Sequence, residues 1–243
     1  MIENIHKDIQ LNLRKYNKEL ENLTAQEVLT WGHKKFDNQF AITTSFGIQS
    51  SVLLNMVSKL CLQKKIKIFW IDTGYLPPET YHYAEKLIEH LSLEVEVLQS
   101  ELSPARMEAK YGKLWETNKE SDLDKYHELR KIKPLENALE KYNIQCWASG
   151  IRSSQTEDRN KMQFLDLIRQ RLSLRPLLNW TNKDIFYYME ENNLPAHPLF
   201  FKGYSTVGDW HSSSPDGIDI KGRATRFGGI KQECGIHIND YQI

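Results

Sequence analysis

The chain has 243 residues, of which 40% are hydrophobic, and its 32 Lys and Arg balance its 32 Asp and Glu. This content is enough for a large core, and the zero net charge gives no general attraction to nucleic acid or to a membrane surface. Three cysteines are too few for a disulfide framework, and no apolar run indicates a signal peptide or a membrane span. We therefore expect a cytoplasmic protein.

Hydrophobic periodicity predicts helices that alternate with short strands. Apolar residues recur at helical spacing over 5–23, and Thr24 with Glu27 forms a capping-box pattern that opens a helix over 24–36. The later expected elements are strands at 40–45, 66–72, 93–99 and 144–150, and helices at 51–63, 77–92, 134–143 and 181–193. This alternation predicts an α/β fold, with a parallel twisted sheet flanked by helices.

Residues 201–243 differ in composition from residues 1–200. Seven of the twelve glycines lie beyond residue 200, together with a cluster of Ser, Asp and Pro. We expect an α/β ligand-binding domain over 1–200 and a mobile, Gly-rich tail over 201–243. The tail carries Cys234 in a segment without an apolar run, so its thiol is expected to be accessible. Cys61 and Cys146 lie in apolar segments and are expected in the core.

Three expected strands end in segments with the chemistry of an anion site, at the edge where open α/β sheets bind ligands. The residues placed there are Ser45, Gly47 and Ser50 after the first strand, Asp72, Thr73 and Gly74 after the second, and Arg152, Gln155 and Arg159 after "WASG". A turn before a helix N-terminus favours an anion, and arginine suits phosphate or sulfate. An ordinary serine N-cap or turn explains each segment alone, but the three together favour a nucleotide or sulfonucleotide site.

Six segments in matching order resemble those of the phosphoadenylyl-sulfate reductase family, thioredoxin-dependent enzymes of assimilatory sulfate reduction. They are "SFGIQSSV", "DTGYLPPETY", "YGKLWE", "GIRSSQTEDR", "HPLFFKGYSTVGDWHSS" and "ECGIH", between residues 40 and 237. The resemblance implies a PP-loop fold (adenine nucleotide α-hydrolase-like) with a sulfonucleotide-binding domain over 1–200. It implies reduction of 3′-phosphoadenylyl sulfate to sulfite and adenosine 3′,5′-bisphosphate, thioredoxin or glutaredoxin as electron donor, and a homodimer.

The same resemblance implies roles for individual residues. Cys234 is expected to be the nucleophile, with Tyr204 and His237 as further participants. The substrate-binding residues implied are Ser45, Phe46, Gly47 and Ser50 for the phosphosulfate, Asp72, Thr73 and Gly74 for the adenosine, and Lys131, Arg152, Arg223, Arg226 and Lys231 for the anionic groups. Ser153 and Gln232 stand where family members often carry arginine, and each removes a basic contact.

The expected reaction passes through a thiosulfonate, Cys–S–SO₃⁻, from which a thioredoxin-like dithiol releases sulfite. The related adenylyl-sulfate reductases bind a [4Fe–4S] cluster through a cysteine pair where this chain has Tyr126 and His127. Such a cluster needs four thiolates, so with three cysteines we expect no cluster and no metal.

Three alternatives stay open. The first is a cluster-free adenylyl-sulfate reductase, and the second is a non-catalytic nucleotide-binding redox sensor with Cys234 as its thiol. The third is an ATP-using PP-loop enzyme, which would typically carry an acid where Gln49 stands.

Overall fold

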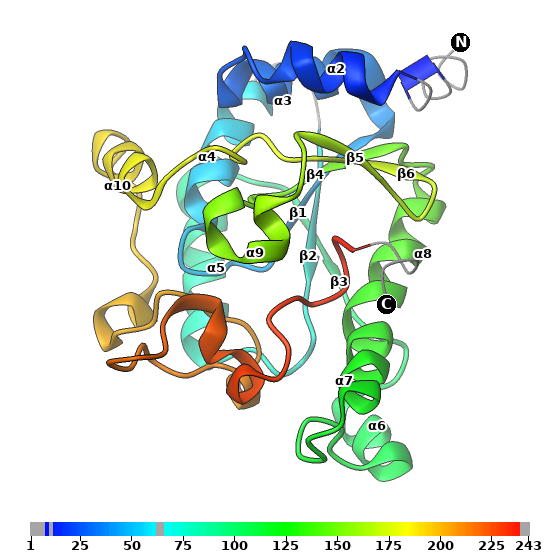
Figure 1. Cartoon of the computed structure of the whole chain (residues 1–243), viewed down its shortest axis with the longest axis vertical. Coiled ribbons are helices and arrows are strands. Elements are labelled where there is room, and N and C mark those ends of the chain that lie inside the picture. Colours follow the sequence, from blue (N-terminus) through cyan, green and yellow to red (C-terminus); the bar gives the residue numbers. More distant parts are fainter. Residues whose placement is uncertain (1–7, 10–11, 62–65, 239–243) are drawn as a thin grey trace.

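A six-stranded sheet forms the centre of the molecule (Figure 1). The computed structural model describes residues 8–9, 12–61 and 66–238. The strands, in sheet order, are β3 (Val95–Leu98), β2 (Lys67–Ile71), β1 (Phe40–Thr44), β4 (Cys146–Ala148), β6 (Arg171–Leu174) and β5 (Leu165–Ile168). All neighbours pair in parallel except the edge strand β5, which is antiparallel to β6. The expected parallel sheet is therefore confirmed, with one antiparallel edge added.

Helices cover both faces of this sheet, as expected. The helices are α2 (Leu13–Leu20), α3 (Ala25–Phe36), α4 (Ser50–Cys61), α5 (Pro78–Leu91), α6 (Pro104–Tyr111), α7 (Glu120–His127), α8 (Lys133–Lys141), α9 (Glu157–Asn160) and α10 (Asn182–Glu191). Figure 1 shows α4 and α5 on one side of the sheet and α8 on the other. Buried residues of α3 belong to the same core as those of α4. Successive side chains of a strand alternate between the faces. Ile42 and Trp70 therefore join the core under α4, whereas Ala41 and Phe69 join the core under α8.

Local sequence signals account for several helix ends. The Thr24 backbone N–H donates to Glu27 Oε2 at 2.8 Å, and Thr181 and Asp184 form the same reciprocal pair at the start of α10. Of the expected helix over 5–23, residues 8–9 and 13–20 are helical, and residues 5–7 and 10–11 lie outside the described residues. The expected helix over 51–63 becomes α4, and residues 62–63 and the side chain of Cys61 lie outside them as well.

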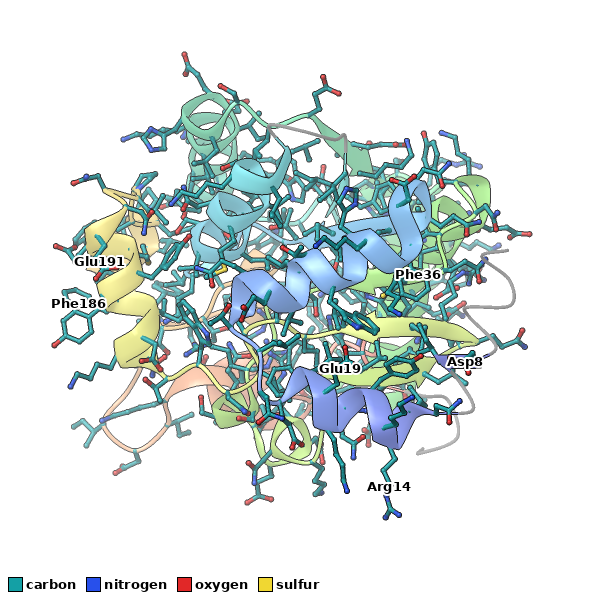
Figure 2. All side chains as sticks on the ribbon, turned by 90° about the horizontal axis from the view of Figure 1, so that it is seen from above. Asp8, Arg14, Glu19, Phe36, Phe186 and Glu191 are labelled. Carbon is teal, nitrogen blue, oxygen red and sulfur yellow. The ribbon has the colours of Figure 1, made fainter. Side chains whose placement is uncertain are left out.

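The side chains divide clearly between surface and core. Figure 2 shows Arg14 of α2 and Phe186 of α10 pointing away from the molecule, and Phe186 is 56% exposed. Phe36, at the end of α3, is fully buried. In the described part of the chain, no helix combines the length and apolar character needed to cross a membrane.

The described part of the C-terminal segment, residues 201–238, packs against the α/β domain. In Figure 1 it runs, orange to red, from the side of α5 toward α8. The Trp210 backbone N–H donates to the Tyr75 carbonyl at 2.7 Å, Phe227 is buried beside Tyr126, and Ile236 joins the core under α8. These contacts hold the segment across the edge of the sheet where the parallel strands end.

Candidate active site

A cavity of about 230 Å³ lies at the carboxyl ends of β1 and β4, under the C-terminal segment. The sequence-predicted residues that line it are Ser45, Gly47, Ser50, Thr73, Lys131, Arg152, Arg223, Arg226, Cys234 and His237. Gln155 and Arg159, expected at the same edge, line it too. The fold thus brings most of the expected strand-end residues to one place, together with Cys234 of the C-terminal segment.

The loop between β1 and α4 lines the cavity with Ser45 and Gly47, and Phe46 between them anchors the loop in the core. Phe46 adopts a left-handed backbone conformation with φ 48°, and its fully buried ring lies edge-on to Trp70, with the ring centroids 4.9 Å apart. Phe46 itself does not line the cavity. The Ser50 backbone N–H donates to the Gly47 carbonyl at 3.1 Å, and the first turn of α4 carries no acidic residue. The helix N-terminus at this loop therefore favours an anion.

Asp72 and Gly74 shape the turn after β2 and do not line the cavity. The Asp72 carboxylate accepts hydrogen bonds from the Gly74 backbone N–H at 2.8 Å, from Tyr81 Oη at 2.7 Å and from Gln99 Nε2 at 2.7 Å. Gly74 has a φ of 73°, which favours glycine. Both residues support the turn that carries Thr73.

Tyr204 and Lys231 also lie away from the cavity wall. Tyr204 packs against the small apolar cluster of Ile48, Leu199 and Val207. Lys231 Nζ lies 3.3 Å from Glu120 Oε1 and hydrogen bonds to Asp124 on α7. Lys231 therefore ties the C-terminal segment to α7.

Asp209, which the sequence analysis did not single out, organises the cationic side of the cavity. Its carboxylate is completely buried and accepts hydrogen bonds from Lys131 Nζ at 2.7 Å and from Thr73 Oγ1. Lys131 lies in a π-helical turn over Glu128–Ile132, a distortion that often occurs at functional sites. Burial opposes ionisation of Asp209, but Lys131, Arg226 and His211 outweigh it and hold its pKa well below the ordinary value.

Arg226 occupies space that only a glycine at position 208 leaves open. A Cβ at Gly208 would overlap the Arg226 guanidinium, whose Nη2 donates to Ser212 Oγ at 2.9 Å. We expect Gly208→Ala to displace this guanidinium and to weaken binding of adenosine 3′,5′-bisphosphate, the product that the sequence resemblance implies. The expected loss is roughly tenfold, which corresponds to one charge-assisted hydrogen bond. Isothermal titration calorimetry measures the dissociation constant. Gly217→Ala, whose Cβ would lie 3.7 Å from its nearest neighbour, is the control, and equal affinities of the two variants would contradict the expectation.

A buried ion pair holds the cysteine-bearing segment against α9. Arg159 Nε and Nη2 donate to the two carboxylate oxygens of Glu233 at 2.8 and 2.9 Å, and Thr156 Oγ1 donates to Glu233 Oε1 at 3.0 Å. Cys234, the next residue, is half-buried. Burial and Arg159 lower the pKa of Arg223 to about 10, whereas Glu233 and a Cys234 thiolate act in the opposite direction. Cys234 thus lies within electrostatic reach of Arg223.

His237 lies between the arginines of this site. Burial and the charges of Arg159, Arg175 and Arg169 lower the pKa of His237 well below its ordinary value. The imidazole is therefore neutral at neutral pH. Its Nδ1 is buried and has no hydrogen-bond partner among the described residues.

The charges of the cavity suit a multiply charged anion. Its cationic lining residues are Lys131, Arg152, Arg159, Arg223 and Arg226. The carboxylates of Asp209 and Glu233 lie among them, so the positive charges outnumber the negative ones. Across the ranges that the structure describes, no three or more His, Cys, Asp or Glu side chains are grouped to hold a metal ion. The arrangement can bind an anion through protein groups and hold a thiol beside it.

Comparison with known proteins identifies close relatives over most of the chain. The family model for the phosphoadenosine phosphosulfate reductase domain matches residues 39–215. A phosphoadenosine 5′-phosphosulfate reductase from Synechococcus sp. is 45% identical over 228 residues, covering 93% of this chain and 97% of the relative. The enzyme of the same name from Shewanella oneidensis is 41% identical, covering 94% of this chain and 92% of the relative.

Solved structures agree with the fold. A phosphoadenylyl-sulfate reductase from Candida auris, in complex with phosphate, superposes with a TM-score of 0.72 at 30% identity, covering 84% of this chain and 97% of that one. The FMN adenylyltransferase of Candida glabrata has a TM-score of 0.56 at 16% identity, covering 81% of this chain and 62% of that one. These neighbours confirm the expected PP-loop type of fold. The chain belongs to the phosphoadenosine phosphosulfate reductase family.

Proposed function

We propose that this chain reduces 3′-phosphoadenylyl sulfate to sulfite and adenosine 3′,5′-bisphosphate in assimilatory sulfate reduction. One observation carries the proposal: Cys234 lines the same cavity as Lys131, Arg152 and Arg226. A thiol beside a cationic pocket is what nucleophilic attack on a bound sulfonucleotide requires. Membership of the family supports this substrate class.

The proposed reaction has two steps. The Cys234 thiolate attacks the sulfonate sulfur, the bond between sulfur and the bridging oxygen breaks, and the nucleotide phosphate leaves. Cys234 then carries the sulfonate as Cys–S–SO₃⁻. A dithiol of a thioredoxin or glutaredoxin attacks Cys234 Sγ and expels sulfite, and its second thiol closes the donor's disulfide and frees Cys234. The dithiol supplies the two electrons that reduce the sulfonate sulfur.

The geometry suggests how the other residues take part. We place the phosphosulfate among Ser45, Gly47, Ser50 and the N-terminus of α4, within reach of the cavity's cations. Thr73 borders the adenosine. The residues with supporting roles are Phe46, Asp72, Gly74, Tyr204 and Lys231, through the loop, turn and segment contacts described above.

The proposal includes no iron–sulfur cluster, because four thiolates are needed and the chain has three cysteines. Cys146 is fully buried in β4. A cytoplasmic location and a homodimer are further parts of the proposal, drawn from the family resemblance. His237, neutral in this setting, would act as a hydrogen-bonding group beside the sulfonate.

Sulfite release by the purified chain with reduced thioredoxin tests the proposal. We expect turnover of 3′-phosphoadenylyl sulfate and a clear preference for it over adenylyl sulfate, supplied at the same concentration. Equal or reversed preference would instead identify a cluster-free adenylyl-sulfate reductase. If neither substrate yields sulfite while adenosine 3′,5′-bisphosphate still binds, the chain is a nucleotide-binding redox sensor.

A further inference from the structure

The guanidinium of Arg152 is held by two neutral amides. Arg152 Nη1 donates to Asn182 Oδ1 at 2.9 Å, and Arg152 Nη2 donates to Gln49 Oε1. Gln49 Nε2 donates to the same Asn182 oxygen at 3.3 Å, which closes the triangle. Arg152 follows β4, Gln49 precedes α4, and Asn182 opens α10, so three separate parts of the chain fix this one side chain.

Three other cations of the cavity pair with carboxylates, whereas Arg226 donates to the neutral Ser212 hydroxyl. Lys131 pairs with Asp209 at 2.7 Å, and Arg159 and Arg223 both lie within ion-pair distance of Glu233. Arg152 is 4% exposed and has no carboxylate within ion-pair distance among residues 8–9, 12–61 and 66–238. Burial and the neighbouring charge of Arg159 lower the pKa of Arg152 to about 10, so it remains charged at neutral pH. Its positive charge is fixed in place without an ion pair, and the Asp184 carboxylate of α10 acts on it only from beyond ion-pair distance.

We propose that Gln49 is a positioning and specificity-determining residue that holds Arg152 through a neutral oxygen and so reserves the whole guanidinium charge for an anionic group of the sulfonucleotide. This rests on the proposed function. Gln49 lines the cavity, so a carboxylate at this position would lie where the ligand binds. It would pair with the guanidinium and repel the anion, because arginine binds carboxylate and phosphate through the same donors. An amide of the same size fixes the geometry without competing for the charge.

Gln49→Glu tests the proposal because it keeps the size of the side chain and changes its charge. We expect its KM for 3′-phosphoadenylyl sulfate and its Kd for adenosine 3′,5′-bisphosphate each to rise by roughly tenfold or more. The change in kcat should be smaller. The melting temperature of the ligand-free protein should stay equal or rise, because Arg152 gains a charged partner. Asn182→Asp places a carboxylate on the same guanidinium from α10 and should reproduce these effects. Gln26→Glu, on the exposed side of α3, is the control for added negative charge.

Two outcomes would overturn the proposal. One is nucleotide binding by Gln49→Glu and Asn182→Asp that matches that of Gln26→Glu. The other is weaker nucleotide binding together with a lower melting temperature in both variants. That result would mean that damaged packing, and not the added charge, reduces the affinity. Absence of turnover by the unsubstituted chain would instead remove the proposed function, and calorimetry with adenosine 3′,5′-bisphosphate would still test the role of Gln49.

Discussion

Cys234→Ser is expected to abolish thioredoxin-dependent sulfite release and to leave the affinity for adenosine 3′,5′-bisphosphate within a few-fold of the original. A serine hydroxyl is a far weaker nucleophile than a thiolate. A sulfonate carried on the serine oxygen could not be released by a dithiol, because the sulfur atom that the dithiol attacks would be missing. The cationic groups of the cavity do not depend on the thiol for their hydrogen bonds, because Lys131 is held by Asp209 and Arg152 by Gln49 and Asn182. Steady-state sulfite assays and calorimetry on the same preparations measure the two effects.

The intermediate can be trapped by leaving out the reductant. With 3′-phosphoadenylyl sulfate alone, the unsubstituted protein should gain the mass of one sulfonate group, on the peptide that contains Cys234. Cys146→Ala serves as the control, because Cys146 is fully buried in β4 and its removal should leave the adduct and the turnover in place. An adduct on Cys234→Ser, or full turnover by that variant, would rule out the proposed nucleophile.

The strands that position the site could be predicted because they are short, apolar and buried. The expected strands at 40–45, 66–72, 93–99 and 144–150 agree with β1 to β4 within a few residues. The hairpin of β5 and β6 was not predicted. Its two-residue turn is Arg169–Gln170, and both residues have positive φ, at 43° and 67°. Such turns usually carry Asn or Gly, so the common sequence signal is missing.

Helices α6 and α7 were missed for a different reason. Only Met107 of α6 is buried, and three residues of α7 are, namely Leu123, Tyr126 and His127. Each helix has only 8 residues, so the buried positions span too few turns to give the repeated apolar stripe that periodicity detects. Both are placed by the aromatic cluster around Tyr75 and Trp115, which forms only in the folded chain.

For the site, as for the fold, the sequence indicated some residues and not others. Strand-end residues such as Ser45, Thr73 and Arg152 were found because parallel strands end at one edge. The carboxylates that orient the cations of the site were not found, because they are distant from these cations in sequence. Glu233 pairs with Arg159 over 74 positions, and Asp209 pairs with Lys131 over 78. Motif resemblance covered Asp209 in "GDWHSS", but only the three-dimensional contacts reveal what it holds.

Asp209→Ala is expected to lower the free energy of unfolding by about 3–5 kcal/mol, the usual cost of leaving one partner of a buried ion pair alone. Lys131 would remain buried, with its side chain 9% exposed, and Thr73 would lose its acceptor. Urea unfolding followed by circular dichroism measures the change. Asp158→Asn is the control, because its pair with Lys161 is exposed at the surface and such pairs contribute about 0–1 kcal/mol. Comparable losses in the two variants would refute a stabilising role for the buried pair.

The pH dependence of Asp209→Asn separates the charge of the carboxylate from its packing. Lys131, Arg226 and His211 hold the pKa of Asp209 below its ordinary value, although burial acts in the opposite direction. A depressed pKa means that the carboxylate stabilises the fold fully above the unfolded pKa of about 3.9 and loses this effect as the pH falls toward the folded pKa. The difference in unfolding free energy between the unsubstituted protein and Asp209→Asn should therefore be constant above about pH 5 and shrink below about pH 4. A difference that does not change between pH 7 and pH 3 would place the role of Asp209 in its shape and hydrogen bonds, and not in its charge.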